Sequence, residues 1–320
     1  MPVPELGRFR VQAAFRQSGA KPETSRAKSS SSIRSITNLF EAERHDMNAD
    51  ESVLFRDIFQ TRKPLIGMIH LLPLPGAPRY DGDGISQQLD AALRDAKALQ
   101  SGGFDGMLME NYGDSPFKPT PTDPETVASM TAIGREISCQ VDLPMGVNVL
   151  RNGAIAALAI AHVLRARFIR VNVLTESMMT DQGIIDACAH DLMRYRRQLG
   201  ALDVRVYADV RSKHAAPIVS RPVEESARDT AYRGMADALI VTGPRTGAEP
   251  DRNELRRIKS SVPDRPALIG SGLTSRNAAN LLKEADGAIV GTSLKEDGRI
   301  ENPIDEDRVK KLVKSTARLR

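Results

Sequence analysis

The sequence feature that most constrains the fold of this chain is a repeated alternation that begins near residue 64. Eight short apolar runs of strand length alternate with eight amphipathic stretches of helical length. The predicted strands are Leu65–Leu71, Gly106–Glu110, Gly146–Leu150, Phe168–Val173, Val204–Val210, Ala238–Val241, Ala267–Gly270 and Ala288–Gly291. The predicted helices are Ile85–Gln100, Pro124–Ser138, Ala154–Leu164, Gly183–Leu199, Val223–Gly234, Asp251–Ser261, Ser275–Lys283 and Asp305–Leu319. Such alternation indicates an α/β fold with a parallel sheet.

Eight strand–helix pairs are the number found in a closed (β/α)₈ TIM barrel, which usually needs about 250 residues. The main alternative is an open, doubly wound sheet, which normally has a Gly-rich turn after its first strand. Here the first strand runs into Leu71-Leu-Pro-Leu-Pro-Gly76, which is a different pattern. We therefore predict one (β/α)₈ barrel over residues 47–320.

The positive charge of the chain is concentrated at its beginning. Residues 1–40 contain seven Lys and Arg against two Asp and Glu, whereas the remaining 280 residues contain 38 against 39. The predicted barrel is therefore almost electrically balanced and has no general electrostatic reason to bind a nucleic acid.

Residues 1–46 are predicted to form a disordered basic tail. They lack sustained apolar periodicity and include the low-complexity stretch Ser25–Ser32. Their Arg- and Ser-rich composition is also typical of an organellar transit peptide, and Met47 is an alternative start. The sequence thus indicates a cytoplasmic protein, with an organelle matrix as the alternative if the tail directs targeting.

Membrane insertion and disulfide bonding are not predicted. No apolar run approaches the roughly 18 residues that span a bilayer. The two cysteines, Cys139 and Cys188, lie far apart and lack metal-binding spacing, which favours a reducing compartment. The sequence is compatible with a homo-oligomer.

Polar side chains lie at the carboxyl ends of most predicted strands, the end that carries the active site in such barrels. Burying them unpaired is costly, so polar ends on six strands favour a functional site over a core network. Asp209 or Glu110 is predicted to be the general acid or base, with His70, Lys213 and His214 completing the catalytic set. The alternative for the last two is a surface basic loop. The strand-end candidates for substrate binding are Asn111, Asn148, Asn172 and Thr242.

Two consecutive strand ends carry a signal for phosphate binding. The seventh predicted strand ends in Gly270-Ser271-Gly272, and the eighth ends in Gly291-Thr292-Ser293. Glycines let the backbone approach a ligand, and backbone N–H groups with hydroxyls suit phosphate oxygens. Many barrels bind phosphate at these two loops, although tight Gly turns would give the same pattern.

No cofactor is predicted, and a divalent metal is an open alternative because His and carboxylate side chains suit several such ions. Its ligands would be His70, Glu110, Asp209 and His214. The polar loop Thr180–Gly183 precedes a predicted helix. Asp181 in this loop is expected either to cap that helix or to fold over the site and bind substrate.

Taken together, the motifs resemble the BtpA family, which is named for a photosystem I biogenesis factor and includes proteins assigned to sugar catabolism and nucleosidase-like activity. The resemblance covers residues from about Met47 to the C-terminus. The matching segments are Gly67–Leu71 with Pro73–Gly76, Gly103–Gly106 with Glu110-Asn111, Gly146–Leu150, Phe168–Val173, Thr180–Gly183, Ala208–Val210 with Lys213-His214, Val241–Gly243 with Thr246-Gly247, Ile269–Gly272, and Asp286–Lys295 with Asn302-Pro303.

The resemblance implies a barrel of the ribulose-phosphate-binding type and supports a phosphate site, but it supplies no established reaction. At two positions the chain departs from the family pattern. Gly153 stands where an Asp is usual, which removes one carboxylate from the predicted site, and Glu176-Ser177 replaces a Gly-Ala-type turn.

Two functions follow as expectations. The first is an enzyme acting on a phosphorylated sugar or nucleoside-like metabolite by isomerisation, aldol-type cleavage or glycosidic cleavage. The alternative is a non-catalytic biogenesis or stability factor for a membrane protein complex, which would retain the pocket from an enzymatic ancestor.

Overall fold

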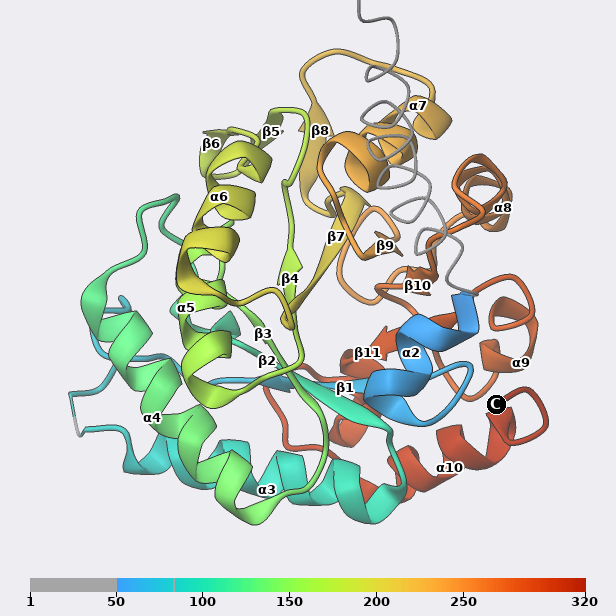
Figure 1. Cartoon of the computed structure of the whole chain (residues 1–320). Coiled ribbons are helices and arrows are strands. Elements are labelled where there is room, and N and C mark those ends of the chain that lie inside the picture. The colour runs from blue at the N-terminus through green and yellow to red at the C-terminus, as the bar shows by residue number, and fades with distance from the viewer. Residues whose placement is uncertain (1–50, 83) are drawn as a thin grey trace, which may run out of the picture. The chain divides into compact units, whose positions relative to one another are not determined.

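A computed structural model describes residues 51–82 and 84–320 (Figure 1). Eight parallel strands close into a barrel in the order β1-β11-β10-β9-β7-β4-β3-β2. These strands are β1 (Leu65–His70), β2 (Gly106–Glu110), β3 (Met145–Asn148), β4 (Phe168–Val171), β7 (Arg205–Arg211), β9 (Ala238–Val241), β10 (Ala267–Ile269) and β11 (Gly287–Val290). The predicted (β/α)₈ barrel is confirmed, and every predicted strand is present. The predicted tail, residues 1–46, lies outside the described residues.

Helices cover the outside of the barrel (Figure 1). They are α3 (Ser86–Gly102), α4 (Pro124–Gln140), α5 (Ala154–Leu164), α6 (Ala189–Leu199), α7 (Val223–Arg228), α8 (Arg252–Ser261), α9 (Ala278–Leu281) and α10 (Glu306–Thr316). The shorter turns are η2 (Tyr112–Asp114), the π-helical η3 (Asp229–Arg233), η4 (Thr292–Leu294) and η5 (Glu296–Gly298). Among the described residues, no helix has the length and apolar character needed to cross a membrane.

Local sequence explains where several helices begin and which face they bury. α8 begins where the Asp251 side chain accepts a hydrogen bond from the N–H of Asn253 at 2.8 Å. α3 buries Ala92, Ala96 and Leu99, which recur at helical spacing and therefore form one apolar stripe against the barrel.

The prediction of a helix over Gly183–Leu199 is wrong in its first part. Gly183–Ile185 forms β6, which pairs with β5 (Met178–Thr180) in an antiparallel hairpin. β5 also pairs with β8 (Ala215–Pro217), so the three strands form a small separate sheet. The positive φ of Gly183, 93°, fits a hairpin turn and not a helix start.

The barrel interior has an apolar lower layer. Its side chains come from the middle and the N-terminal ends of the strands, and each is buried. This layer contains Met68, Leu108, Phe168, Tyr207, Ile240, Leu268 and Ile289. The packed layer supports the polar strand ends above it, because a barrel of eight strands is filled by side chains and leaves no pore.

A helix that the sequence pattern did not predict closes the N-terminal end of the barrel. α2 (Glu51–Phe59) places Phe55 edge-on to Tyr207, with ring centroids 6.0 Å apart. Phe59 likewise meets Phe168 at 5.8 Å. These aromatic contacts join α2 to the lower layer, so the opposite, C-terminal end is the open end of the barrel.

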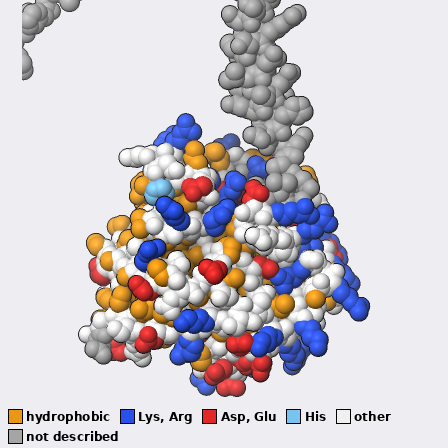
Figure 2. Space-filling view, turned by 60° about the horizontal axis from the view of Figure 1, so that its bottom comes forward, with side chains coloured by type: hydrophobic (Ala, Val, Ile, Leu, Met, Phe, Trp, Pro, Cys, Tyr) orange, Lys and Arg blue, Asp and Glu red, His pale blue; other side chains and the backbone are white. Residues whose placement is uncertain are grey.

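Charges of both signs occupy the surface. On the face that Figure 2 shows, Lys and Arg side chains lie among Asp and Glu side chains, with the basic ones most frequent along one edge. Apolar side chains are scattered between them, as on most protein surfaces.

Candidate active site

The next inward-facing position on each strand lies two residues beyond the apolar layer, because side chains alternate between the faces of a strand. These eight positions form a ring at the open end of the barrel. They are His70, Glu110, Asn148, Arg170, Asp209, Thr242, Gly270 and Gly291. We call the first five the side-chain half. We call residues 270–274 and 291–293, which follow β10 and β11, the glycine half.

Arg170 and Asp209 form a two-pronged ion pair in the side-chain half. Arg170 donates to Oδ1 of Asp209 from Nε at 3.2 Å and from Nη2 at 3.0 Å, and to Oδ2 at 3.2 Å. Asn172 donates to the same Oδ2 at 3.0 Å. Both side chains of the pair are at most 1 % exposed. Because its charge is paired and both its oxygens are occupied, Asp209 is better placed to orient Arg170 than to accept a proton.

Glu110 and His70 lie beside each other at the ends of β2 and β1. Nε2 of His70 lies 4.0 Å from Oε1 of Glu110. Asn148 on β3 donates a hydrogen bond to Oε2 of Glu110, which leaves Oε1 on the histidine side. The ring of Tyr112 meets the His70 ring edge-on, with centroids 5.0 Å apart. The structure therefore brings together a carboxylate and an imidazole, as a proton-transfer pair requires.

Burial lowers the pKa of His70 well below its ordinary value of 6.5. The positive charges of Lys295, Lys213 and Arg170 lower this pKa further. His70 is therefore neutral at neutral pH. Its Nδ1 is buried and has no hydrogen-bond partner among the described residues. A neutral imidazole can accept one proton and donate another, which is the property of a general acid or base.

Lys213 follows β7 and lines the same pocket as His70 and Arg170. Burial lowers the pKa of its ammonium group, and the charge of Arg170 acts in the same direction. Glu110 and Asp209 offset part of this shift. The backbone of Lys213 is held in place because Arg151 donates from Nη2 to its carbonyl oxygen at 2.8 Å.

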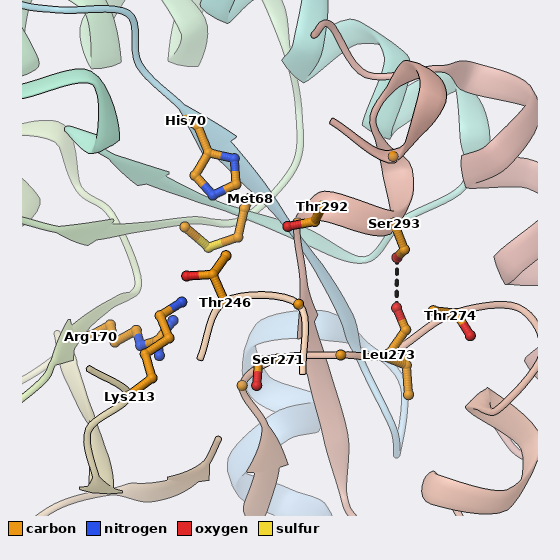
Figure 3. Close-up of a pocket in the computed structure, with 15 residues that line it drawn as sticks. Met68, His70, Arg170, Lys213, Thr246, Ser271, Leu273, Thr274, Thr292 and Ser293 are labelled. Atoms are coloured by element: carbon orange, nitrogen blue, oxygen red, sulfur yellow. Dashed lines mark hydrogen bonds between the residues drawn. The ribbon is translucent and has the colours of Figure 1, made fainter. Parts of the chain in front are cut away.

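A pocket of about 180 Å³ lies between the two halves of the ring. Figure 3 shows Lys213 beside Arg170 on one side, His70 above them, and the loops of the glycine half opposite. The glycine half contributes all of its residues to the lining, from Gly270 to Thr274 and from Gly291 to Ser293. The predicted phosphate loops therefore line the same cavity as His70, Arg170 and Lys213.

Some backbone N–H groups of the glycine half make hydrogen bonds, such as that of Gly270 to the carbonyl oxygen of Val241, and others make none. The N–H groups of Gly272, Leu273, Thr292 and Ser293 donate to no other described residue. Four unpaired N–H groups in two adjacent loops are suited to the oxygens of an anion.

Side chains could not replace the glycines without displacing their neighbours. A Cβ on Gly291 would lie 2.8 Å from Cε1 of His70. A Cβ on Gly272, where φ is 71°, would lie 2.4 Å from the backbone of Ala248. Gly291 therefore leaves room for the His70 ring, and Gly272 lets its loop pack closely against the loop that contains Ala248.

The four hydroxyl side chains of the glycine half differ in their partners, and that of Thr274 donates to Oδ1 of Asn277 at 3.1 Å. Ser271 donates to the carbonyl oxygen of Ala248 at 2.8 Å. Ser293 donates to the carbonyl oxygen of Leu273 at 2.6 Å, which is the dashed line in Figure 3. The hydroxyl of Thr292 has no hydrogen bond to the described residues and faces the pocket, so it is the one best placed to reach a ligand.

Two other predicted binding residues hold loops together outside the pocket. Asn111 accepts from the N–H of Leu150 at 2.7 Å and donates to Oδ2 of Asp114 at 2.9 Å. Thr242 donates from its hydroxyl to the carbonyl oxygen of Arg211 at 3.1 Å. Neither lines the pocket. Their polar atoms are used to join neighbouring strand ends.

Asp181 and His214 lie at the outer edge of the site. Asp181 is exposed in the turn between β5 and β6, so it caps no helix. The exposed side chain of His214 has its Nε2 3.1 Å from the hydroxyl of Thr246. Because Thr246 itself lines the pocket, His214 supports the pocket wall from behind.

The four side chains considered for a metal do not converge. Asp209 is turned to Arg170, and His214 is turned to Thr246. His70 and Glu110 remain close to each other. Among residues 51–82 and 84–320, no three His, Cys, Asp or Glu side chains are grouped to hold a metal ion.

Arg170 and Arg151 are functional candidates that the sequence analysis missed. Arg170 lies two residues after Phe168, so strict two-residue alternation along β4 would have placed it in the ring. Arg151 had no comparable signal, because its contact with Lys213 depends on how the loop after β3 folds.

Both the fold and the strand-end site define a TIM barrel with an open pocket at the C-terminal ends of its strands. A solved structure described as "Native KDPGal structure" superposes with a TM-score of 0.50 at 17 % identity, covering 82 % of this chain and 98 % of that one. At this identity the likeness shows the fold alone.

The chain belongs to the BtpA family, whose model matches residues 61–318. It is 46 % identical over 259 residues to an uncharacterised protein of Pyrococcus furiosus, covering 81 % of this chain and 97 % of the relative. It is 43 % identical over 259 residues to the photosystem I biogenesis protein BtpA of Synechocystis sp., covering 81 % of this chain and 90 % of the relative.

The two departures from the family pattern lie away from the pocket. A Cβ on Gly153 would lie 2.4 Å from Oγ1 of Thr122, so this position has no room for a larger side chain unless its neighbours move. Glu176 accepts hydrogen bonds from Arg221 at 2.7 Å and Ser226 at 3.1 Å. Neither departure changes the lining of the pocket.

Proposed function

We propose that this protein is an enzyme that acts on a phosphorylated sugar or nucleoside-like metabolite. The observation that carries the proposal is the pocket between the two halves of the ring. One wall presents unpaired backbone N–H groups, and the other presents Arg170 and Lys213. Backbone N–H groups and cations that face each other across a small cavity suit a phosphate group.

The side-chain half and the neighbouring Lys213 supply the groups for chemistry next to that phosphate. Neutral His70 and Glu110 form the proton-transfer pair, and Lys213 stabilises negative charge that develops on the substrate. Isomerisation, aldol-type cleavage and glycosidic cleavage all require a proton to move at a carbon or oxygen near a bound phosphate. The arrangement therefore supports this group of reactions.

Thermal unfolding in the presence of inorganic phosphate, ribose 5-phosphate and ribose tests the binding part of the proposal. A ligand at 100 times its Kd stabilises the folded state by about 2.7 kcal/mol, so millimolar phosphate compounds should raise the Tm clearly. Ribose alone should raise it much less. Equal shifts with ribose and ribose 5-phosphate, or no shift with either, would contradict a phosphate pocket.

The name of the Synechocystis relative supports a second candidate function, a non-catalytic factor for the biogenesis of a membrane protein complex. The two candidates are separated by a variant that damages the ring, Asp209→Asn. An enzyme loses turnover in this variant, whereas an assembly factor that only retains the pocket keeps its effect on the complex.

A further inference from the structure

The buried Lys295 and the half-buried Lys213 have opposite surroundings. The Nζ of Lys295 lies 2.6 Å from Oδ2 of Asp95, in an ion pair whose side chains are at most 6 % exposed. The Nζ of Lys213 donates no hydrogen bond to the described residues and forms no ion pair with them. Figure 3 shows it pointing into the pocket beside Arg170, on the side of Thr246. Lys295 is thus a structural cation, whereas Lys213 is an unpaired amine in a cavity.

The charges around Lys213 are already balanced without it. Arg170 is paired with Asp209, and near this lysine the positive charge of Arg151 offsets the negative charge of Glu110. A protonated Lys213 would therefore add a cation that has no counterion of its own. Burial and the nearby Arg170 lower the pKa of this lysine, so its uncharged amine forms more readily than that of an exposed lysine. An uncharged lysine amine is a nucleophile toward carbonyl carbon.

We propose that Lys213 forms an imine with the carbonyl carbon of a phosphorylated aldehyde or ketone. This inference rests on the proposed function, because the glycine half must hold the phosphate while the carbonyl group faces Lys213. The substrate class is thereby narrowed to phosphorylated carbonyl compounds.

The step balances with the groups present. The Nζ–carbon bond forms as the carbon–oxygen double bond opens, and one N–H proton moves to the oxygen to give a carbinolamine. The second N–H proton then leaves with that hydroxyl group as water, and the carbon–nitrogen double bond remains. Neutral His70 lines the same pocket and can relay both protons.

Reductive trapping tests the proposal directly. The full-length protein is treated with sodium borohydride in the presence of dihydroxyacetone phosphate, glyceraldehyde 3-phosphate or ribose 5-phosphate, and the adduct is located by peptide mass spectrometry. At least one probe should add its own mass less one oxygen atom to Lys213, with one adduct per chain. Dihydroxyacetone without phosphate should label this lysine at least about tenfold less, because it lacks the group that the glycine half binds.

Matched variants show whether the adduct depends on this amine. Lys213→Arg keeps a cation and Lys213→Met removes it, and both should abolish the adduct while Lys97→Met, on the exposed face of α3, leaves it unchanged. Thermal unfolding confirms that each variant is folded. The pH dependence of trapping should have its midpoint below the ordinary lysine pKa of about 10.4.

Labelling of other lysines only, or no adduct with any of the three probes, would overturn the imine. These failures can be distinguished from failure of the proposed function. If phosphate still raises the Tm of the wild-type protein but nothing is trapped, Lys213 acts as a cation and the phosphate pocket stands. If phosphate raises the Tm of neither the wild-type protein nor the variants, the pocket itself is contradicted.

Discussion

The two halves of the strand-end ring treat their polar groups in opposite ways. In the side-chain half, Arg170 pairs with Asp209, and Asn148 donates to Glu110, so most polar atoms satisfy one another. In the glycine half, Gly270 and Gly291 have no side chain to fill the ring. The backbone N–H groups of the residues that follow them, at 272–273 and 292–293, make no hydrogen bond to the described residues.

This difference teaches how one barrel end can combine rigidity with binding. A network that is internally paired keeps its geometry without a ligand, which is the condition for a preorganised catalytic wall. A loop with unpaired N–H groups gains its hydrogen bonds only when an anion arrives. The side-chain half is therefore expected to control stability, and the glycine half is expected to control affinity for phosphate.

The largest effect is expected for Arg170→Met, which leaves Asp209 as an unpaired buried charge. Removing one partner of a buried ion pair costs about 3–5 kcal/mol. The free energy of unfolding from urea titration should fall by this amount. The comparison would fail if the variant were as stable as the wild-type protein.

An exposed ion pair provides the control for this prediction. Arg257 contacts both carboxylate oxygens of Glu224, as Arg170 does with Asp209, but its side chain is 55 % exposed. Arg257→Met should change the free energy of unfolding far less than Arg170→Met does, because exposed pairs are well solvated and screened. Similar losses of unfolding free energy in the two variants would show that burial does not make the strand-end pair more important for stability.

The second largest effect is expected for Gly272→Ala in the glycine half. Its positive φ and the 2.4 Å approach to the backbone of Ala248 force the loop to move. We expect the affinity for inorganic phosphate, measured by calorimetry, to fall about a hundredfold, which corresponds to about 2.7 kcal/mol.

Gly200→Ala is the matched control for this change. Gly200 also has a positive φ, 73°, but a Cβ there meets no atom within 4 Å. It should lower stability by about 1 kcal/mol through backbone strain and leave phosphate binding unchanged. Unchanged phosphate binding in Gly272→Ala would show that the glycine half does not hold the anion.

The barrel and the positions of the strand ends were predictable, because hydrophobic periodicity depends on local sequence. The side-chain half shows where this reasoning stops. Asp209 was correctly placed at a strand end, but its pairing with Arg170 depends on which strands become neighbours after closure. Asn172, directly after β4, was predicted to bind substrate because it is polar, although the inward-facing position two residues earlier is Arg170.

Other features depended on contacts between distant segments. α2 is too short to be recognised by periodicity. The role of its aromatic residues is visible only from their ring contacts with Phe168 and Tyr207, which are distant in the sequence. The strand β6 was assigned to a helix because its pairing with β5 is not visible in its own three residues. In the glycine half, the glycines were readable from the sequence, whereas the missing hydrogen bonds of their neighbours were not.

A smaller effect is expected for Thr292→Val, which removes the one hydroxyl of the glycine half that has no protein partner. The change preserves shape, so only a hydrogen bond to the ligand is lost. Phosphate affinity should fall about tenfold, or about 1.4 kcal/mol, near the lower end for a hydrogen bond to a charged group. The control is Thr131→Val on α4, whose hydroxyl bonds to Val127 and should not affect binding. Equal affinities for the two variants would remove Thr292 from the site.

The last expected effect is a slope and not a single energy: it concerns the pH dependence of stability and links the two halves. The pKa of His70 is lowered by folding, so below about pH 6.5 the unfolded chain binds a proton that the folded protein does not. Stability is therefore lost as the pH falls through this range, by at most about 1.4 kcal/mol per pH unit. His70→Asn should flatten the slope of the unfolding free energy between pH 7 and 5. His214, whose pKa is also lowered, contributes equally to both proteins and cancels in the difference.

Bound phosphate should reduce the same slope in the wild-type protein. Part of the His70 shift comes from the positive charges of Lys213 and Arg170, and an anion in the glycine half screens them. The pKa of His70 should then rise toward its ordinary value, and the acid sensitivity of stability should weaken with millimolar phosphate. His70→Asn should show no such phosphate-dependent change in slope. If phosphate altered the slopes of both proteins equally, the halves would be electrostatically independent, and the anion would not lie between His70 and the two cations.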